Sequence, residues 1–181
     1  MTATALVPIA NGSEDIESVT IIDVLRRAGV QVTVASVHAD ATITAARQTR
    51  ITADTLITDC SAQSFDLIAL PGGMPGASNL GDSQPLVEML RTQKKAGRLY
   101  GAICAAPAVA LEPNGLLEGH SATAHPGFQN QLSDQGRIGE RVVVDGHCIT
   151  SQGPGTALEF ALTLVEHLCG RAKHDEDATP M

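Results

Sequence analysis

The alternation of apolar and polar segments along the chain predicts strands that alternate with helices. The candidate strands are the short apolar runs at residues 3–9, 30–37, 65–70 and 99–104. Apolar residues at helical spacing lie between them, most clearly at residues 14–28 and 85–95. Such alternation is typical of a mostly parallel sheet that is covered by helices on both faces. We therefore expect an α/β fold.

The segment at residues 14–28 carries signals for both ends of a helix. Acids such as Glu14 occupy its first turn and Arg27 its last turn, where each complements the helix dipole. Ser13 is a candidate N-cap and Gly29 is the expected C-cap. The first helix should therefore start directly after the first strand and its turn.

The sequence predicts further β structure outside these four strands. Residues 41–56 are rich in Thr and favour a hairpin-like excursion. The dipeptide Asp145-Gly146 between two apolar runs is a two-residue hairpin signal. Residues 120–125 are a further expected strand.

The end of the chain is expected to form a helix and a tail. The turn at residues 153–155 opens a helix that runs to about Cys169. The residues that follow are polar, so we expect a frayed tail at residues 171–181. Because the 181 residues contain no linker-like segment, the sequence predicts a single domain at residues 1–170.

Composition argues against several classes of function. A chain with 43% hydrophobic and 18% charged residues has the balance of an ordinary globular protein. Its 2% aromatic residues offer few stacking platforms for nucleic acid, and its net charge of −8 repels a phosphate backbone. There is no signal-peptide pattern and no apolar run of about eighteen residues. We predict a cytoplasmic protein without a membrane partner, and the sequence carries no specific signal for binding nucleic acid.

The spacing of the cysteines, histidines and glycines indicates neither a metal site nor a nucleotide-binding site. Cys60, Cys104, Cys148 and Cys169 are widely spaced without a CxxC pair, so we expect reduced thiols rather than a zinc site or disulfides. The histidines lack metal-ligand spacing such as HxxxH. The glycines match neither nucleotide-binding pattern, GxGxxG or GxxxxGK[ST]. The sequence thus predicts no metal and no cofactor.

Cys104 lies where a buried strand is expected to turn directly into a helix. Pro107 fits only within the first turn of that helix. Such a junction resembles a nucleophile elbow, in which a sharp turn projects a side chain beside N–H groups that can hold an oxyanion. A helix N-terminus also favours a thiolate. The alternative is a small buried cysteine without chemistry, but its position favours a reactive one.

Glu17 and His125 are candidates to act beside this cysteine. Glu17 lies one turn into the first helix on an apolar stripe, so its carboxyl should have a raised pKa and donate a hydrogen bond to a thiolate. The alternative is an acid that only complements the helix dipole. His125 precedes Pro126 at the end of an expected strand, from which its imidazole could reach a site. Otherwise it is a solvated loop histidine.

Three segments are expected to meet at one edge of the sheet, because active sites of parallel sheets lie beyond the carboxyl ends of the strands. They are the loop before Glu14, the Gly72-Gly73 loop and Cys104. The two glycines allow a backbone geometry that is closed to other residues. The alternative for this pair is a tight loop without a functional role.

Five motifs in this order resemble those of the ThiJ/PfpI superfamily. They are GSEDIE (residues 12–17), LPGG (70–73), AICAAP (102–107), HP (125–126) and SQGPGT (151–156). The similarity spans roughly residues 3–170 and is greatest to the YajL-like branch, which includes the parkinsonism-associated protein deglycase. The resemblance implies a flavodoxin-like three-layer α/β/α sandwich with a mostly parallel central sheet, a homodimer and a cofactor-independent site.

The resemblance also implies roles for the residues that carry the chemistry. Cys104 is then the nucleophile, Glu17 its hydrogen-bonded acid and His125 a nearby proton-transfer group. The protease-like branch has a His directly after the nucleophile, whereas this chain has Ala105. Without that base, a Cys-His peptidase is not expected.

The backbone and the interface complete this implied site. Gly72, Gly73 and Ala105 form the implied oxyanion site. Arg27 and Arg50 match arginines that the family places at the dimer interface near the site. The chain ends soon after its last predicted helix, so we expect no extra C-terminal helix over the site.

Two functions fit these residues. The first is a cysteine-dependent glyoxalase or protein deglycase that converts 2-oxoaldehydes such as glyoxal and methylglyoxal, or their early protein adducts, into 2-hydroxy acids. The second is an oxidative-stress thiol sensor or redox-regulated chaperone, in which Cys104 is oxidised and Glu17 stabilises the product. Thiamine-precursor biosynthesis is suggested only by a family name, and the sequence has no phosphate-binding signal.

Overall fold

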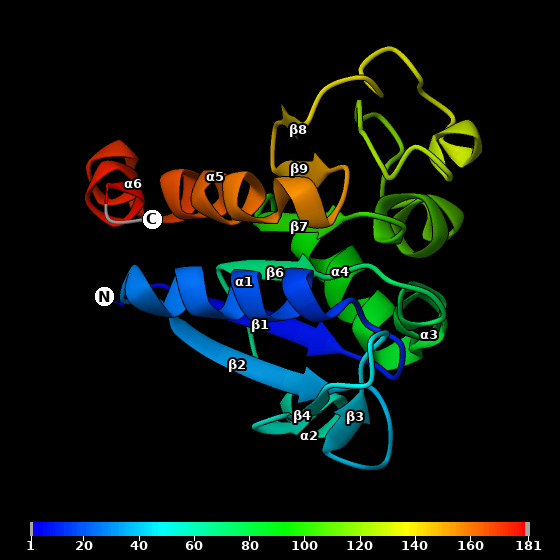
Figure 1. Cartoon of the computed structure of the whole chain (residues 1–181), viewed down its shortest axis with the longest axis vertical. Coiled ribbons are helices and arrows are strands. Elements are labelled where there is room, and N and C mark those ends of the chain that lie inside the picture. Colours follow the sequence, from blue (N-terminus) through cyan, green and yellow to red (C-terminus); the bar gives the residue numbers. More distant parts are fainter. Residues whose placement is uncertain (1, 180–181) are drawn as a thin grey trace.

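A seven-stranded sheet forms the centre of the computed structural model, which describes residues 2–179 (Figure 1). In spatial order its strands are β5 (Thr55–Leu56), β2 (Gln31–Ser36), β1 (Thr4–Ile9), β6 (Leu67–Leu70), β7 (Leu99–Ile103), β9 (Cys148–Ser151) and β8 (Val142–Asp145). Neighbouring strands are parallel except β8 and β9, which are antiparallel. The prediction of an α/β fold with a mostly parallel sheet is confirmed.

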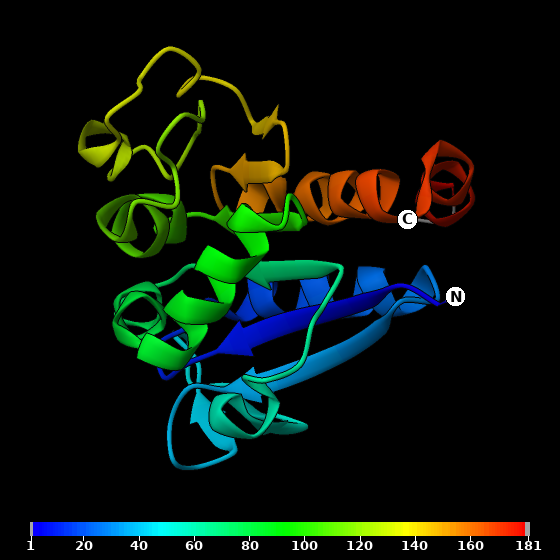
Figure 2. The same cartoon turned by 180° about the vertical axis from the view of Figure 1, so that it is seen from behind.

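Helices cover both faces of this sheet. On one face, α1 (Asp15–Arg27) and α5 (Ala157–Cys169) lie side by side (Figure 1). On the other face lie α2 (Ile57–Cys60), α3 (Gly76–Asp82) and α4 (Gln84–Lys95) (Figure 2). The central strands β1 and β6 are therefore buried on both sides, which explains their nearly continuous apolar sequence. The three-layer, flavodoxin-like arrangement is confirmed.

The Thr-rich segment forms the expected hairpin apart from the main sheet. β3 (Thr42–Thr44) and β4 (Arg50–Thr52) pair antiparallel. The turn between them folds back onto the start of α1, where the Arg47 amide donates to Asp15 Oδ2 at 2.8 Å. The hairpin turn therefore stands beside the loop that follows β1.

The expected strand at residues 120–125 is wrong. Within the described chain this segment joins no sheet, and the Thr123 amide instead donates to the side chain of Thr150 at 2.9 Å. β9 already pairs with β7 on one edge and β8 on the other. An apolar segment beside it therefore finds no open strand edge to join.

The second hairpin is confirmed with its turn shifted by one residue. Asp145 pairs with Cys148, so the two connecting residues are Gly146 and His147 rather than Asp145-Gly146. Gly146 takes the left-handed conformation there, with φ of 59°. The shorter helical elements are a π-helical turn at Pro107–Leu111 and 3₁₀ turns at Glu112–Asn114, Gln129–Gln131 and Pro154–Thr156.

The predicted frayed tail is wrong, because Arg171–Ala178 forms a further helix, α6, that packs against α5. Its polar sequence is held by ion pairs one turn apart, Arg171 with Asp175 at 3.0 Å and Lys173 with Asp177 at 3.3 Å. The sequence led us to expect no extra C-terminal helix over the site. α6 is a further helix, but it lies near the amino ends of the strands and does not cover their carboxyl ends (Figure 1). Residues 180–181 of the predicted tail lie outside the described residues.

Candidate active site

Cys104 directly follows β7, at a sharp turn into the helical segment that begins at Pro107. Its φ is +66°, a left-handed conformation that costs a residue with a side chain roughly 1–2 kcal/mol. Both of its backbone groups are held: its amide donates to the Ser151 carbonyl at 2.9 Å, and its carbonyl accepts from the His125 amide at 2.8 Å. The structure thus has the predicted strand-to-helix elbow at Cys104, held in a strained conformation.

The loop after β6, which contains Gly72, packs directly against Cys104. A Cβ on Gly72 would lie 2.5 Å from the Cβ of Cys104, so only glycine permits the approach. The Gly72 amide donates to Glu17 Oε2 at 2.8 Å. Gly72 therefore positions Glu17 and is not a free donor, which corrects its expected place in the oxyanion site.

Glu17 is fully buried in the first turn of α1. The turn is capped by Glu14, whose side chain accepts from the Glu17 amide at 2.9 Å. Ser13, the expected cap, instead accepts from the Ala10 amide at 3.0 Å. Glu17 Oε1 is buried without a hydrogen-bonded nitrogen or oxygen among residues 2–179, and the neighbouring Cys104 thiol interacts with this carboxyl.

Glu17 and Cys104 form a coupled pair of acids. Burial raises the pKa of Glu17 to about 7, as expected for a carboxyl on an apolar face. Burial and the adjacent Glu17 charge raise the pKa of Cys104 to about 12, against the lowering expected from a helix N-terminus alone. Because each charge opposes the other, the pair carries one negative charge and one proton over a wide pH range.

Two backbone amides face the sulfur of this pair. The N–H groups of Gly73 and Ala105 interact with the Cys104 sulfur, and both lower its pKa. Gly73 has φ of +83°, and a Cβ on it would lie 2.5 Å from the Glu14 amide nitrogen. These two donors can stabilise a negative charge on the sulfur or on an atom bound to it.

His125 stands on the solvent side of the pair. It is exposed, and its Nδ1 accepts from the Gly127 amide at 3.1 Å, which leaves the proton of the neutral ring on Nε2. A Cβ on Gly153 would lie 3.5 Å from His125 Cδ2 and 4.0 Å from both Cys104 Sγ and Glu17 Oε1. The three candidate residues therefore surround one point in space.

A cavity of about 340 Å³ opens onto this point. Its lining residues are Glu14, Ala46, Arg47, Gly73, Met74, Cys104, Ala105, His125, Phe128 and Pro154. Among these residues the sequence analysis missed Ala46, Arg47, Met74, Phe128 and Pro154, and it also missed Gly153 beside them. Gly153 and Pro154 had a sequence signal, because they belong to the last of the five motifs. Arg47 reaches the cavity through the hairpin turn, which no local pattern specifies.

The two predicted interface arginines do not line this cavity in the described chain. Arg27 lies ten residues beyond Glu17 on α1, about 15 Å along the helix, and pairs with Asp23 at 2.8 Å. Arg50 is exposed on β4. The arginine that lines the cavity is Arg47. The interface role of Arg27 and Arg50 remains a prediction.

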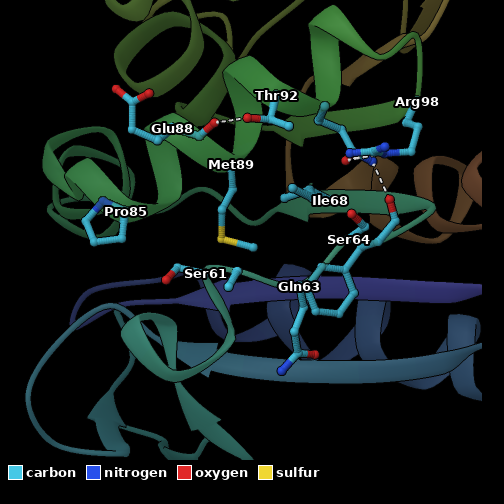
Figure 3. Close-up of a pocket in the computed structure, with 12 residues that line it drawn as sticks. Ser61, Gln63, Ser64, Ile68, Pro85, Glu88, Met89, Thr92 and Arg98 are labelled. Atoms are coloured by element: carbon cyan, nitrogen blue, oxygen red, sulfur yellow. Dashed lines mark hydrogen bonds between the residues drawn. The ribbon is translucent and has the colours of Figure 1, made fainter.

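A second cavity of about 340 Å³ lies on the face of the sheet that α4 covers, between α4 and the loop before β6 (Figure 3). Met89 points into it. The buried Gln93 at its wall accepts from Arg98 Nε at 3.1 Å and donates to the Phe65 and Leu99 carbonyls. Its lining includes neither cysteine nor histidine. The Gln93 side chain therefore links α4 to the loop before β6 and to the start of β7.

Residues 2–179 hold no group of three His, Cys, Asp or Glu side chains placed to bind a metal. Over the same range, no helix has the length and apolar character needed to cross a membrane.

Comparison with known proteins identifies the family. A model of the DJ-1/PfpI family matches residues 3–167. The chain belongs to the DJ-1/PfpI family. The resemblance carried by the five motifs is thereby confirmed, and Glu17, Cys104, His125 and Gly153 all fall within the DJ-1/PfpI match.

DJ-1/PfpI relatives match nearly the whole chain. Protein DJ-1 homolog B of Arabidopsis thaliana is 51% identical over 168 residues, which are 93% of this chain but only 38% of that protein. The chain thus spans less than half the length of this relative. Glutathione-independent glyoxalase DJR-1.2 of Caenorhabditis elegans is 38% identical over 93% of this chain and 90% of its own. The solved structure of Toxoplasma gondii DJ-1, oxidized, is 45% identical and covers 99% of this chain and 97% of its own, with a TM-score of 0.97.

Proposed function

We propose that the chain is a cofactor-independent glyoxalase or protein deglycase that uses Cys104 to act on 2-oxoaldehydes or their early protein adducts. The observation that carries the proposal is the coupled pair of Cys104 and the fully buried Glu17, which opens onto a cavity beside His125. The Caenorhabditis elegans relative named a glutathione-independent glyoxalase supports this chemistry.

The reactive form has a thiolate on Cys104 and a protonated Glu17. An ionised Glu17 would leave Oε1 charged and buried, with the weak S–H donor of Cys104 but no nitrogen or oxygen donor in residues 2–179. A protonated Oε1 can donate to the sulfur instead, while two N–H groups face that sulfur. The hydrogen bonds therefore favour placing the shared proton on the carboxyl.

The reaction of methylglyoxal then balances without an external oxidant. The thiolate attacks the aldehyde carbon, and the N–H groups of Gly73 and Ala105 stabilise the oxyanion of the hemithioacetal. Glu17 and His125 move a proton from the aldehyde carbon to the neighbouring carbonyl carbon through an enediol. The aldehyde carbon becomes a thioester as the ketone becomes an alcohol. Water then releases lactate and restores the thiol.

The second candidate function is a thiol sensor or redox-regulated chaperone that uses the same cysteine. Cys104 is only 8% exposed but lines an open cavity, so peroxide can reach its sulfur. Glu17 and the two facing amides can donate hydrogen bonds to sulfur-bound oxygens. The similar solved structure of Toxoplasma gondii DJ-1 is of an oxidized protein, which supports the sensor or chaperone function as an alternative.

Turnover separates the two functions, because a sensor reacts once and stops. We expect the purified chain to convert many equivalents of methylglyoxal to lactate, and Cys104→Ser to abolish this conversion. Cys169→Ser, which removes an exposed cysteine in α5, is the matched control and should retain turnover. At most one equivalent of product per chain would refute the enzyme proposal. The same assay with a methylglyoxal-modified peptide shows whether an adduct is accepted.

A further inference from the structure

Gly153 lies at the centre of the candidate site, although its motif looks like a helix start. The position that a Cβ would take on Gly153 is 4.0 Å from Cys104 Sγ, 4.0 Å from Glu17 Oε1 and 3.5 Å from His125 Cδ2. These are ordinary van der Waals distances. A methyl group would therefore fit beside the free thiol while touching all three side chains.

The backbone conformation does not require glycine here. Gly153 has φ of 160° and ψ of −164°, which is extended backbone. What glycine provides at this position is the space that a side chain would fill. An atom bound to Cys104 Sγ on the side that faces Gly153 would be too close to a methyl group on residue 153, and the two would clash.

Hydrogen bonds hold the backbone around Gly153 in place, so it cannot easily move away from Cys104. Its amide donates to Thr156 Oγ1 at 3.1 Å, and its carbonyl accepts from the Thr156 amide at 2.9 Å. Thr156 Oγ1 is in turn 2.6 Å from Ser151 Oγ, which donates to the Arg141 carbonyl. A side chain added at position 153 would thus narrow the site.

We propose that Gly153 is a specificity-determining position, whose missing side chain reserves the space where an atom attached to Cys104 meets Glu17 and His125. The proposal rests on the proposed function, because the atom that exchanges protons must touch these carriers. It limits the substrate class to carbonyl compounds whose reacting carbon is small, as an aldehyde carbon is. Gly153 itself exchanges no proton and acts through the space it leaves.

Gly153→Ala tests this proposal, and Gly155→Ala is its matched control. Gly155 lies in the same turn and has open space around its Cβ position among the described residues. We expect Gly153→Ala to lower kcat/KM for methylglyoxal at least about tenfold, with a larger loss for the bulkier phenylglyoxal than for glyoxal. Gly155→Ala should stay within about twofold of wild type. Equal values for the two variants would overturn the proposal.

Alkylation of Cys104 by iodoacetamide, followed by intact mass, checks that the thiol itself is unchanged. The alkyl group can extend into the open cavity and needs no proton carrier. We expect Gly153→Ala to be alkylated within about twofold of the wild-type rate, with an unchanged circular dichroism spectrum. A loss of alkylation as large as the loss of turnover would show a general disturbance of the site and overturn the assigned role.

Peroxide oxidation keeps the test independent of glyoxalase activity. A sulfinic acid carries two oxygens on Sγ. In the proposed arrangement one oxygen faces the amides of Gly73 and Ala105, and the other takes the space beside Gly153. With excess hydrogen peroxide as oxidant, wild type and Gly155→Ala should gain two oxygens on Cys104, whereas Gly153→Ala should stop at one. Absence of wild-type turnover would refute the proposed function alone. Two oxygens on Gly153→Ala, formed at the wild-type rate, would refute the role of Gly153.

Discussion

Glu17 accepts a hydrogen bond of 2.8 Å from the amide of Gly72, 55 residues further along the chain. This bond ties the first turn of α1 to the loop after β6. It uses Oε2 and leaves Oε1 for the thiol of Cys104. The relationship explains how a carboxyl is kept fully buried beside a cysteine, and it makes Glu17 the residue whose substitution is most informative.

Glu17→Gln should separate proton relay from oxidation. The amide keeps the size of the side chain and a hydrogen-bond donor but removes the exchangeable proton. We expect methylglyoxal turnover to fall by about 10² or more, as is typical for loss of a general acid-base. Peroxide should still oxidise Cys104, because an amide can donate to sulfur-bound oxygens. Unchanged turnover in a folded variant would refute the relay and favour the sensor.

The thiolate absorbance near 240 nm reports where the shared proton lies. We expect the difference between wild type and Cys104→Ser to rise with a midpoint below about 8.5, the ordinary pKa of a thiol. The coupled pair loses its first proton near pH 7, and the two amides that face the sulfur favour placing the resulting charge there. An absence of thiolate below about pH 10 would instead place the proton on sulfur and the charge on Glu17.

Burial of Glu17 should make stability depend on pH. Its pKa rises from 4.5 to about 7 on folding, so the folded chain binds more protons than the unfolded chain between these values. The free energy of unfolding should therefore decrease as pH rises through this window. As pH rises from 4.5 to 7, the free energy of unfolding of Glu17→Gln should increase by up to about 3 kcal/mol relative to that of wild type, as measured by urea titrations. Glu118→Gln, which changes an exposed acid, is the control. If the stability of Glu17→Gln followed the same pH dependence as that of wild type, the raised pKa of Glu17 would be contradicted.

Arg47 and Arg50 provide a matched pair of substitutions. Arg47 lines the Cys104 cavity, whereas Arg50 on the same hairpin does not. A cation there should attract and stabilise developing negative charge, so we expect Arg47→Ala to lower kcat/KM for methylglyoxal about three- to tenfold, with Arg50→Ala near wild type. Asp15→Ala should reproduce part of the Arg47 effect, because Asp15 accepts from the Arg47 and Thr49 amides and docks the turn. A larger effect of Arg50→Ala would show that Arg50 acts at a site, as the family resemblance implies.

The homodimer implied by the family resemblance makes a prediction for α1. Ile16 and Val19, one turn apart on this helix, are 55% and 51% exposed. Light scattering should give twice the monomer mass of 18.8 kDa, and Ile16→Glu with Val19→Lys should give the monomer. The control is Leu158→Glu, which places a charge on α5 where the apolar side chain is also exposed. A wild-type mass of one monomer would remove the dimer and any site shared across it.

Much of the fold follows from local patterns. The four buried strands, the helices α1 and α4 and the β8–β9 hairpin lie within a few residues of their predicted positions, because period, caps and turn residues act over a few neighbours. The errors concern partners that are distant in sequence. Residues 120–125 have strand character but no free edge to join, and α6 is stabilised by packing on α5 and by ion pairs that the polar composition hides.

The candidate site divides in the same way. The sequence by itself determined that Cys104 follows a strand, that Glu17 lies on the buried face of a helix and that Gly72 and Gly73 form a loop, since each is a local property of the chain. Only the tertiary structure decided that the Gly72 amide serves Glu17, that Arg47 rather than Arg50 reaches the cavity, and that Gly153 stands between Cys104, Glu17 and His125. The tertiary structure also decided the protonation of the Cys104–Glu17 pair. Burial and mutual repulsion set both pKa values, and they depend on which groups the fold removes from water together.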